Sequence, residues 1–169
     1  MQKLPRTAAA DLSGTIVALG SPSLSKKHDW LTPGTVVFGG INNVGQNTAY
    51  GALSTYAVVH VDRIQPIPTS AAAREAGVDE ATAAGLGIVA TTAHAQAAHV
   101  KKGDRVFING GTSAVGLLVA DFARIRGAHL IVATASGPKA ELVKKRGVDE
   151  VIDCEASSLL LATTFGDAV

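Results

Sequence analysis

The stretch Arg105-Val-Phe-Ile-Asn-Gly-Gly-Thr-Ser-Ala-Val-Gly116 decides the fold of this chain. Residues 105–109 are a short, mostly apolar run of the kind that forms a buried strand, and a glycine-rich turn follows at 110–116. Apolar residues then recur at helical spacing up to Arg126, and the next residue, Gly127, is suited to end a helix. The stretch therefore predicts a strand, a tight turn and a helix in direct succession.

The same alternation continues toward the C-terminus. Residues 129–134 predict a second strand, and residues 149–153 predict a third. Between them, Pro138 is suited to the first turn of a helix that ends at Gly147. Strands that alternate with helices of this length form a parallel sheet from right-handed βαβ units, so we expect an α/β fold with a βαβαβ unit over residues 101–169.

The chain before this unit has a different sequence pattern. Residues 13–20, 34–38 and 53–61 predict short strands, with prolines confined to the connections. Residues 39–50 are rich in Gly and Asn and predict a loop. We therefore expect a small β unit over residues 1–77, in which Trp30 and Tyr56 pack against the core.

Two connecting helices are expected over residues 78–100. Asp79 is a suitable N-cap, because its carboxylate can accept hydrogen bonds from the free N–H groups of the first turn. Gly85 and Gly87 interrupt the alanine-rich run that follows and should divide it into two helices.

Composition excludes several classes of protein. Of 169 residues, 47% are hydrophobic and 17% charged, which is too apolar for a disordered chain. The net charge of +1 gives no excess of positive charge that would attract nucleic acid or an anionic membrane. The single cysteine excludes an internal disulfide framework, and no apolar run is long enough for a membrane span, so a cytoplasmic location is expected.

The glycine-rich turn is the strongest candidate for a functional site. Free N–H groups at a helix N-terminus, together with the helix dipole, suit an anion such as a pyrophosphate. Gly110 fits the tight turn and Gly116 fits close packing of helix on strand, while Ser113 replaces the middle glycine of the usual dinucleotide fingerprint. The alternative is a glycine-rich turn that binds no ligand.

The end of the second predicted strand favours NADP(H) over NAD. NAD-binding sites usually carry an acidic residue there for the ribose hydroxyl, and such a residue would repel a 2′-phosphate. This chain instead has Ser136 and Lys139, which offer a hydroxyl donor and a positive charge. The alternative is that Ser136 only caps a helix and that Lys139 is an ordinary surface lysine.

The chain resembles the medium-chain dehydrogenase/reductase superfamily, and within it the zinc-independent branch of quinone oxidoreductases and enoyl reductases. Segments that match the pattern occur in order along nearly the whole chain: Asp11-Leu-Ser-Gly14, Pro33-Gly-Thr-Val-Val-Phe-Gly39, Gly51-Ala-Leu-Ser-Thr-Tyr-Ala-Val-Val59, Asp62-Arg-Ile-Gln-Pro-Ile-Pro68, Thr91-Thr-Ala-His94, residues 102–116 and residues 139–153.

This resemblance implies a partial GroES-like β-barrel unit followed by the first half of a Rossmann domain. It implies hydride transfer from NADPH to a small-molecule quinone, enone or enoyl thioester; no catalytic residue is assigned. The pyrophosphate contacts would map onto Thr112, Ser113, Ala114, Val115 and Gly116, and the 2′-phosphate contacts onto Ser136 and Lys139. Thr92 matches a threonine on the nicotinamide side.

The chain also departs from the family pattern. It has no His-Glu pair, and Cys154 is its one cysteine, so no zinc site is expected; Cys154 itself is expected to be buried or to line an adenine pocket. Family members are about twice as long, so the chain looks truncated at both ends. The second hypothesis is therefore an inactive dinucleotide-binding or protein-interaction module, whose exposed sheet edge could pair with a second copy.

Overall fold

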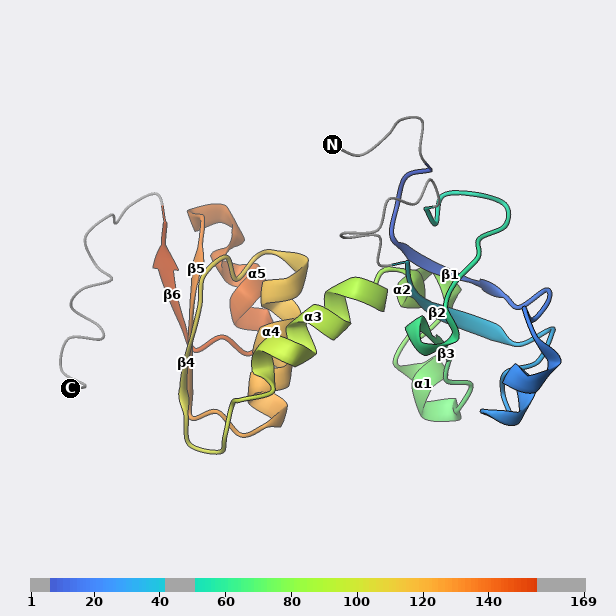
Figure 1. Ribbon diagram of the computed structural model, residues 1–169. Coiled ribbons are helices and arrows are strands. Elements are labelled where there is room, and N and C mark those ends of the chain that lie inside the picture. Colours follow the sequence, from blue (N-terminus) through green and yellow to red (C-terminus); the bar gives the residue numbers. More distant parts are fainter. Residues whose placement is uncertain (1–6, 42–50, 155–169) are drawn as a thin grey trace. The chain divides into compact units, whose positions relative to one another are not determined.

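The computed structural model describes residues 7–41 and 51–154 (Figure 1). The chain divides into two compact units, Met1–Ile88 and Val89–Val169. Each unit has its own sheet and its own core, and each is described by itself.

The first unit contains a three-stranded antiparallel sheet. Phe38 is opposite Ser13 on one side and Gln65 on the other, which fixes the register of all three strands. Gly39 and Gly40 belong to the middle strand, so the predicted loop over 39–50 begins too early; residues 42–50 lie outside the described residues. In sheet order, the strands are β1 (Asp11–Thr15), β2 (Val36–Gly40) and β3 (Ile64–Pro66).

A small apolar cluster stabilises this sheet. Ile16, Leu31, Val37 and Ile64 are buried, and Trp30 packs against them half-buried. The prediction that Trp30 anchors the β unit is confirmed. The ring of His28 also stacks on the Trp30 indole at a centroid distance of 5.4 Å.

The predicted strand over residues 53–61 is wrong. The backbone there is irregular and ends in a 3₁₀ helix, η2 (Val61–Arg63). Leu53, Tyr56 and Val58 are 73%, 75% and 85% exposed, so the expectation that Tyr56 packs in the core is also wrong. A β-branched, apolar run becomes a strand only where a neighbouring strand accepts its hydrogen bonds and a core covers its side chains.

Short helices follow the antiparallel sheet. A 3₁₀ helix, η1 (Pro22–Lys26), lies earlier in the unit, and α1 (Ala71–Glu75) precedes α2 (Glu80–Ala84). Asp79 caps α2 as predicted, with Oδ1 accepting a hydrogen bond from the Thr82 N–H at 2.7 Å. This hydrogen bond holds the pKa of the Asp79 carboxyl below its ordinary value.

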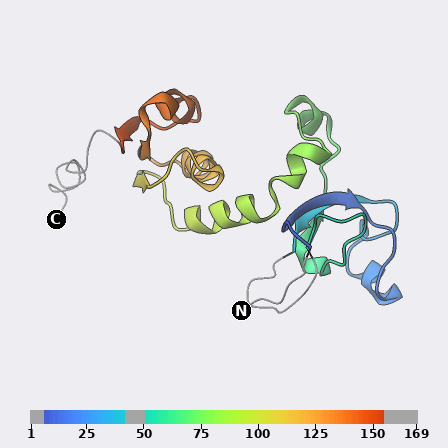
Figure 2. The same cartoon turned by 90° about the horizontal axis from the view of Figure 1, so that it is seen from above.

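The alanine-rich run is divided as the glycines predict. Gly85 is the C-cap of α2, and α3 (Gly87–Ala97) begins two residues later, as the green ribbon in Figure 2 shows. Asp11 of β1 accepts a hydrogen bond from the Ile88 N–H at 2.5 Å and so satisfies a free donor in the first turn of α3. A Cβ on Gly87 would lie 2.1 Å from the Gly39 carbonyl oxygen, so only glycine fits this contact.

The second unit is a three-stranded parallel sheet with helices between the strands. Ile108 is opposite Ala133, and Ala133 is opposite Val151, so the carboxyl ends of the three strands lie at one edge. In chain order, the elements are β4 (Arg105–Ile108), α4 (Ala114–Ile125), β5 (Leu130–Ala135), η3 (Gly137–Lys139), α5 (Ala140–Lys145) and β6 (Glu150–Asp153), and the sheet order is β4-β5-β6. The predicted α/β architecture is confirmed.

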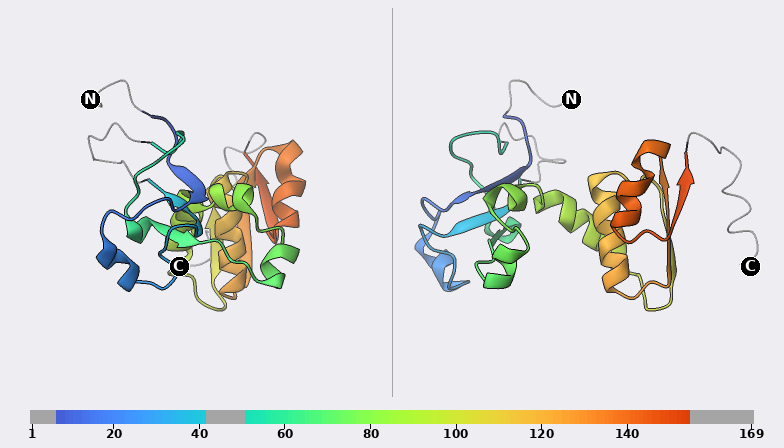
Figure 3. Two further views of the ribbon diagram at one scale, coloured as in Figure 1. Left: turned by 90° about the vertical axis from the view of Figure 1, so that its right-hand side faces the viewer. Right: turned by 180° about the vertical axis from the view of Figure 1, so that it is seen from behind.

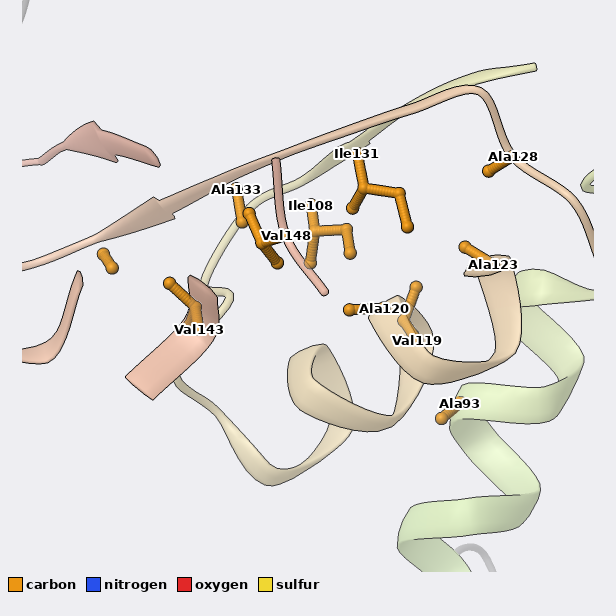
Figure 4. Packing of buried hydrophobic residues seen from close by; sticks show 11 residues of the cluster. Ala93, Ile108, Val119, Ala120, Ala123, Ala128, Ile131, Ala133, Val143 and Val148 are labelled. Carbon is orange, nitrogen blue, oxygen red and sulfur yellow. The ribbon is translucent and has the colours of Figure 1, made fainter. Parts of the chain in front are cut away.

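Helices α4 and α5 cover the same face of this sheet (Figure 3). Their shared core consists of small and branched apolar residues, and Figure 4 shows Ile108, Ile131 and Val148 directed toward Val119 and Ala120 of α4. The alanines let helix and sheet approach closely. Both helices end as the sequence predicts, because Gly127 and Gly147 each have a φ of 85°, which is strained for other residues. No helix in the described part of the chain is long and apolar enough to cross a membrane.

Candidate functional site

The glycine-rich turn leaves β4 and enters α4 through a sharp bend. Gly110 has a φ of 77°, which glycine adopts without strain. The carbonyl oxygen of Gly110 accepts a hydrogen bond from the Ser113 N–H at 3.0 Å, which closes the turn. The prediction that Gly110 serves the tight turn is confirmed.

Two further glycines are required because neighbouring atoms lie directly against them. A Cβ on Gly116 would lie 2.3 Å from the Gly110 carbonyl oxygen, so no side chain fits without a shift of the backbone. A Cβ on Gly111 would lie 2.6 Å from the Ala133 methyl group of β5. Gly111 thus packs the turn against the next strand. The nearest atoms to Gly116 belong to the turn itself, at Gly110 and Ser113, whereas the sequence predicted close packing of helix on strand at Gly116.

Ser113 is the N-cap of α4. Its hydroxyl oxygen accepts a hydrogen bond from the Gly116 N–H at 2.9 Å, and the hydroxyl hydrogen is left to donate elsewhere. Ala114 and Val115 occupy the first two helical positions, where N–H groups have no acceptor within the helix. Ser113 and Ala114 are exposed, whereas Thr112 and Val115 are half-buried. These groups form a cradle of donors that suits an anion.

The sequence interpretation missed Thr134, the buried polar residue of β5. Its hydroxyl oxygen accepts a hydrogen bond from the Gly110 N–H at 2.8 Å, and the hydroxyl donates to Asn109 Oδ1 at 3.0 Å. The Thr134 carbonyl oxygen accepts a hydrogen bond from the Gly111 N–H at 2.9 Å. The available sequence signal is a threonine within the apolar strand that follows the turn and its helix. The hydrogen bonds between Thr134 and the turn are visible only in the fold.

Ser136 and Lys139 lie together in the segment that follows β5. Ser136 precedes η3, and its hydroxyl makes no capping hydrogen bond, so the interpretation of Ser136 as a helix cap has no support in its side chain. Lys139 is exposed at the end of the same short helix. Because both residues follow β5, the strand that packs against the glycine-rich turn, they lie at the carboxyl edge of the parallel sheet.

An acidic residue of the next strand lies beside this segment. Asp153 ends β6 and is opposite Ala135 in the register. A Cβ built on Gly137 would lie 3.2 Å from Asp153 Oδ2. The sequence interpretation looked for an acid only at the end of β5, and so it missed a carboxylate that the sheet register brings beside the same loop.

Two other predicted residues belong to other elements than the turn. Thr92 is half-buried on α3, beside Ala93, which packs in the core of the second unit. Cys154 is exposed, so the expectation that it is buried is wrong; its N–H donates to the Ala135 carbonyl oxygen at 3.3 Å. The roles predicted for Thr92 and for Cys154 at an adenine pocket stay predictions.

Electrostatic contacts elsewhere are structural. Arg124 of α4 donates to Asp149 Oδ2 at 2.7 Å, and the Ile131 N–H donates to the same oxygen at 2.7 Å. Partial burial works to raise the pKa of the Asp149 carboxyl, but these two donors outweigh it and hold the pKa below its ordinary value. In the first unit, the ion pair with Lys27 lowers the pKa of Asp62.

Comparisons with known proteins show which enzymes this chain is similar to. No protein-family model matches the chain. A trans-enoyl reductase from Aspergillus terreus is 27% identical over 156 residues, which cover 92% of this chain and 42% of that enzyme. The structure of a quinone oxidoreductase from Coxiella burnetii superposes with a TM-score of 0.74 at 26% identity, covering 94% of this chain and 46% of that one. Along nearly its whole length the chain is similar to enoyl reductases and quinone oxidoreductases of the medium-chain dehydrogenase/reductase superfamily.

This similarity to medium-chain dehydrogenases/reductases confirms the resemblance seen in the sequence. The chain spans less than half the length of these two relatives. An Escherichia coli quinone oxidoreductase, solved in complex with NADPH, shares the fold with a TM-score of 0.73 at 19% identity, covering 96% of this chain and 46% of that one. The antiparallel sheet followed by a parallel sheet therefore matches the fold of these solved quinone oxidoreductases over the part that this chain covers.

Proposed function

We propose that this chain forms the NADP(H)-binding part of an oxidoreductase of the quinone or enoyl reductase type. The reaction is hydride transfer from NADPH to a quinone or to an activated C=C bond of an enone or enoyl thioester. The proposal rests on one observation above all: the glycine-rich turn, closed at Gly110 and tightly packed at Gly111 and Gly116, leads directly into the N-terminus of α4, where the first N–H groups have no acceptor within the helix.

The residues of the cradle fit a pyrophosphate. The Ala114 and Val115 N–H groups point outward from the first turn of α4, and the Ser113 hydroxyl hydrogen adds a third donor. The positive end of the helix dipole favours negative charge at the same place. Thr112 completes the turn, so these residues would hold and orient the two phosphates without a charged side chain.

The segment after β5 supports the choice of NADP(H) over NAD(H). The Lys139 ammonium group would balance the charge of a 2′-phosphate, and the Ser136 hydroxyl would donate a hydrogen bond to it. Asp153 opposes this charge, because its carboxylate also borders Gly137. We infer that Ser136 and Lys139 outweigh Asp153, since the two donors belong to the loop itself.

When bound, NADPH supplies the hydride. The contribution of this chain would be positional: the turn fixes the pyrophosphate, and Thr92 would lie toward the nicotinamide. Fixing the cofactor in a reactive orientation can lower a barrier substantially without any acid or base. The proposal includes zinc-independent chemistry, in keeping with the single cysteine and the lack of a His-Glu pair in this sequence. It also includes a cytoplasmic location.

A titration tests the proposal. Purified protein is titrated with NADPH and with NADH, followed by cofactor fluorescence, and NADPH consumption is then measured with a quinone and with an enone. Tighter binding of NADPH than NADH, with consumption of NADPH, is the expected result. Binding without turnover would favour the alternative of an inactive dinucleotide-binding module, and failure to bind either cofactor would make the glycine-rich turn purely structural.

A further inference from the structure

Thr134 is a polar side chain in an otherwise apolar environment. It is 8% exposed, within a strand whose neighbouring residues Ala133 and Ala135 are buried. A buried hydroxyl destabilises a fold unless its donor and its acceptor are both satisfied. Here both are satisfied by the turn after β4, through the Gly110 N–H and Asn109 Oδ1.

Thr134 also holds the turn through its backbone. Its carbonyl oxygen accepts the Gly111 N–H at 2.9 Å, so two successive N–H groups of the turn end on this single residue of β5. Both donors lie at glycines, where the backbone is otherwise the least restricted. The hydroxyl and the carbonyl together remove that freedom.

The position of Gly110 is transmitted to the start of α4. The Gly110 carbonyl oxygen accepts the Ser113 N–H at 3.0 Å, and it lies against Gly116. A shift of Gly110 would therefore move Ser113 and the first turn of α4. That turn carries the N–H groups of Ala114 and Val115.

We propose that Thr134 is a positioning residue for the pyrophosphate site, acting through Gly110 and never touching the ligand. This inference rests on the proposed function, because it concerns the same NADP(H) site. A valine has the shape of threonine but no hydroxyl, so Thr134→Val would leave the Gly110 N–H and Asn109 Oδ1 without their partner. The turn would then relax away from the geometry that binds two phosphates.

The experiment compares two ligands in two variants of the full chain. NADPH carries the pyrophosphate, whereas adenosine 2′-monophosphate carries the ribose phosphate without it. Thr134→Val should raise the Kd for NADPH about tenfold and change that for adenosine 2′-monophosphate less than about twofold. Thr134→Ser, which keeps the hydroxyl, should restore NADPH binding to within about threefold of the original chain.

Other results would overturn the inference. Equal weakening of both ligands by Thr134→Val would show a general loss of structure, and unchanged NADPH binding would show that the hydroxyl does not position the turn. If Thr134→Val does not fold, Asn109→Ala replaces it, because Asn109 is exposed. That variant should weaken NADPH binding alone, by about threefold, and no selective loss would overturn the inference. Failure of the unaltered chain to bind NADPH would instead reject the proposed function itself.

Discussion

The hydroxyl oxygen of Thr134 accepts a hydrogen bond from the Gly110 N–H at 2.8 Å, although the two residues are 24 positions apart in the chain. This contact joins the carboxyl ends of β4 and β5 at the point where the glycine-rich turn begins. It explains how a turn with three glycines keeps one shape. The rigidity of the proposed cofactor site thus comes from the neighbouring strand as much as from the turn.

Ser113 allows helix stability to be separated from cofactor binding. Ser113→Asp keeps a good N-cap and places a negative charge at the positive end of α4, so Tm should be unchanged or higher. The same charge should repel a pyrophosphate and weaken NADPH binding more than about tenfold. Ser113→Ala is the control: loss of the cap should cost about 1 kcal/mol of stability. Unchanged NADPH affinity in Ser113→Asp would argue against a phosphate site here.

Gly116→Ala should destabilise the protein despite the better helix propensity of alanine. Alanine gains about 1 kcal/mol over glycine within a helix, but its Cβ would lie 2.3 Å from a backbone oxygen. Overpacking of this kind costs about 1–3 kcal/mol, so urea unfolding should show a net loss. Gly20→Ala is the matched control, because a Cβ there has no neighbour within 4 Å. Equal stability of both variants would show that the turn can yield.

Lys139→Ala should reduce the preference for NADPH. Loss of a charged partner for the 2′-phosphate should raise the Kd for NADPH about tenfold and leave that for NADH unchanged. Lys145→Ala removes the same charge from the exposed surface of α5 and should change neither Kd. If Lys145→Ala has the same effect as Lys139→Ala, only the net charge matters, and the site assignment fails.

Asp153→Asn tests the charge that the fold brings to the same loop. Removing the carboxylate beside Gly137 should strengthen NADPH binding about two- to threefold, and the effect should shrink at high ionic strength because salt screens exposed charges. Isothermal titration at two salt concentrations measures both effects. If Asp153→Asn instead weakens NADH binding and leaves NADPH binding no tighter, the Asp153 carboxylate holds a ribose hydroxyl. That result would reverse the proposed cofactor preference.

Asp149 should make stability depend on pH. Its folded pKa is depressed, so the carboxylate contributes stability above its unfolded pKa of about 4 and loses that contribution as pH falls through the lower folded value. Asp149→Asn should therefore lower unfolding free energy by about 1 kcal/mol at neutral pH, allowing for the partial exposure of the pair. The difference between the two proteins should vanish in acid. A constant difference across the pH range would mean that ionisation of Asp149 is not involved.

Local sequence signals predicted the second unit well. The apolar runs of β4, β5 and β6, the helical spacing of α4 and the glycines at 127 and 147 act within one element, so the sequence alone is sufficient to find them. Asp79 is a similar case, because its cap involves residues of the same turn. The predicted strand at 53–61 failed because a strand depends on a partner that its own residues do not encode.

The sequence by itself determined the strand–turn–helix order, the tight turn at Gly110 and the segment that contains Ser136 and Lys139. Only the tertiary structure decided which groups meet there. The parallel register brings Thr134 to Gly110 and Asp153 to Gly137. Hydrogen bonding and charge act over a few ångströms in space, whereas sequence patterns report only neighbours along the chain. The threonine bonded to the turn and the acid beside Gly137 therefore became visible only in the fold.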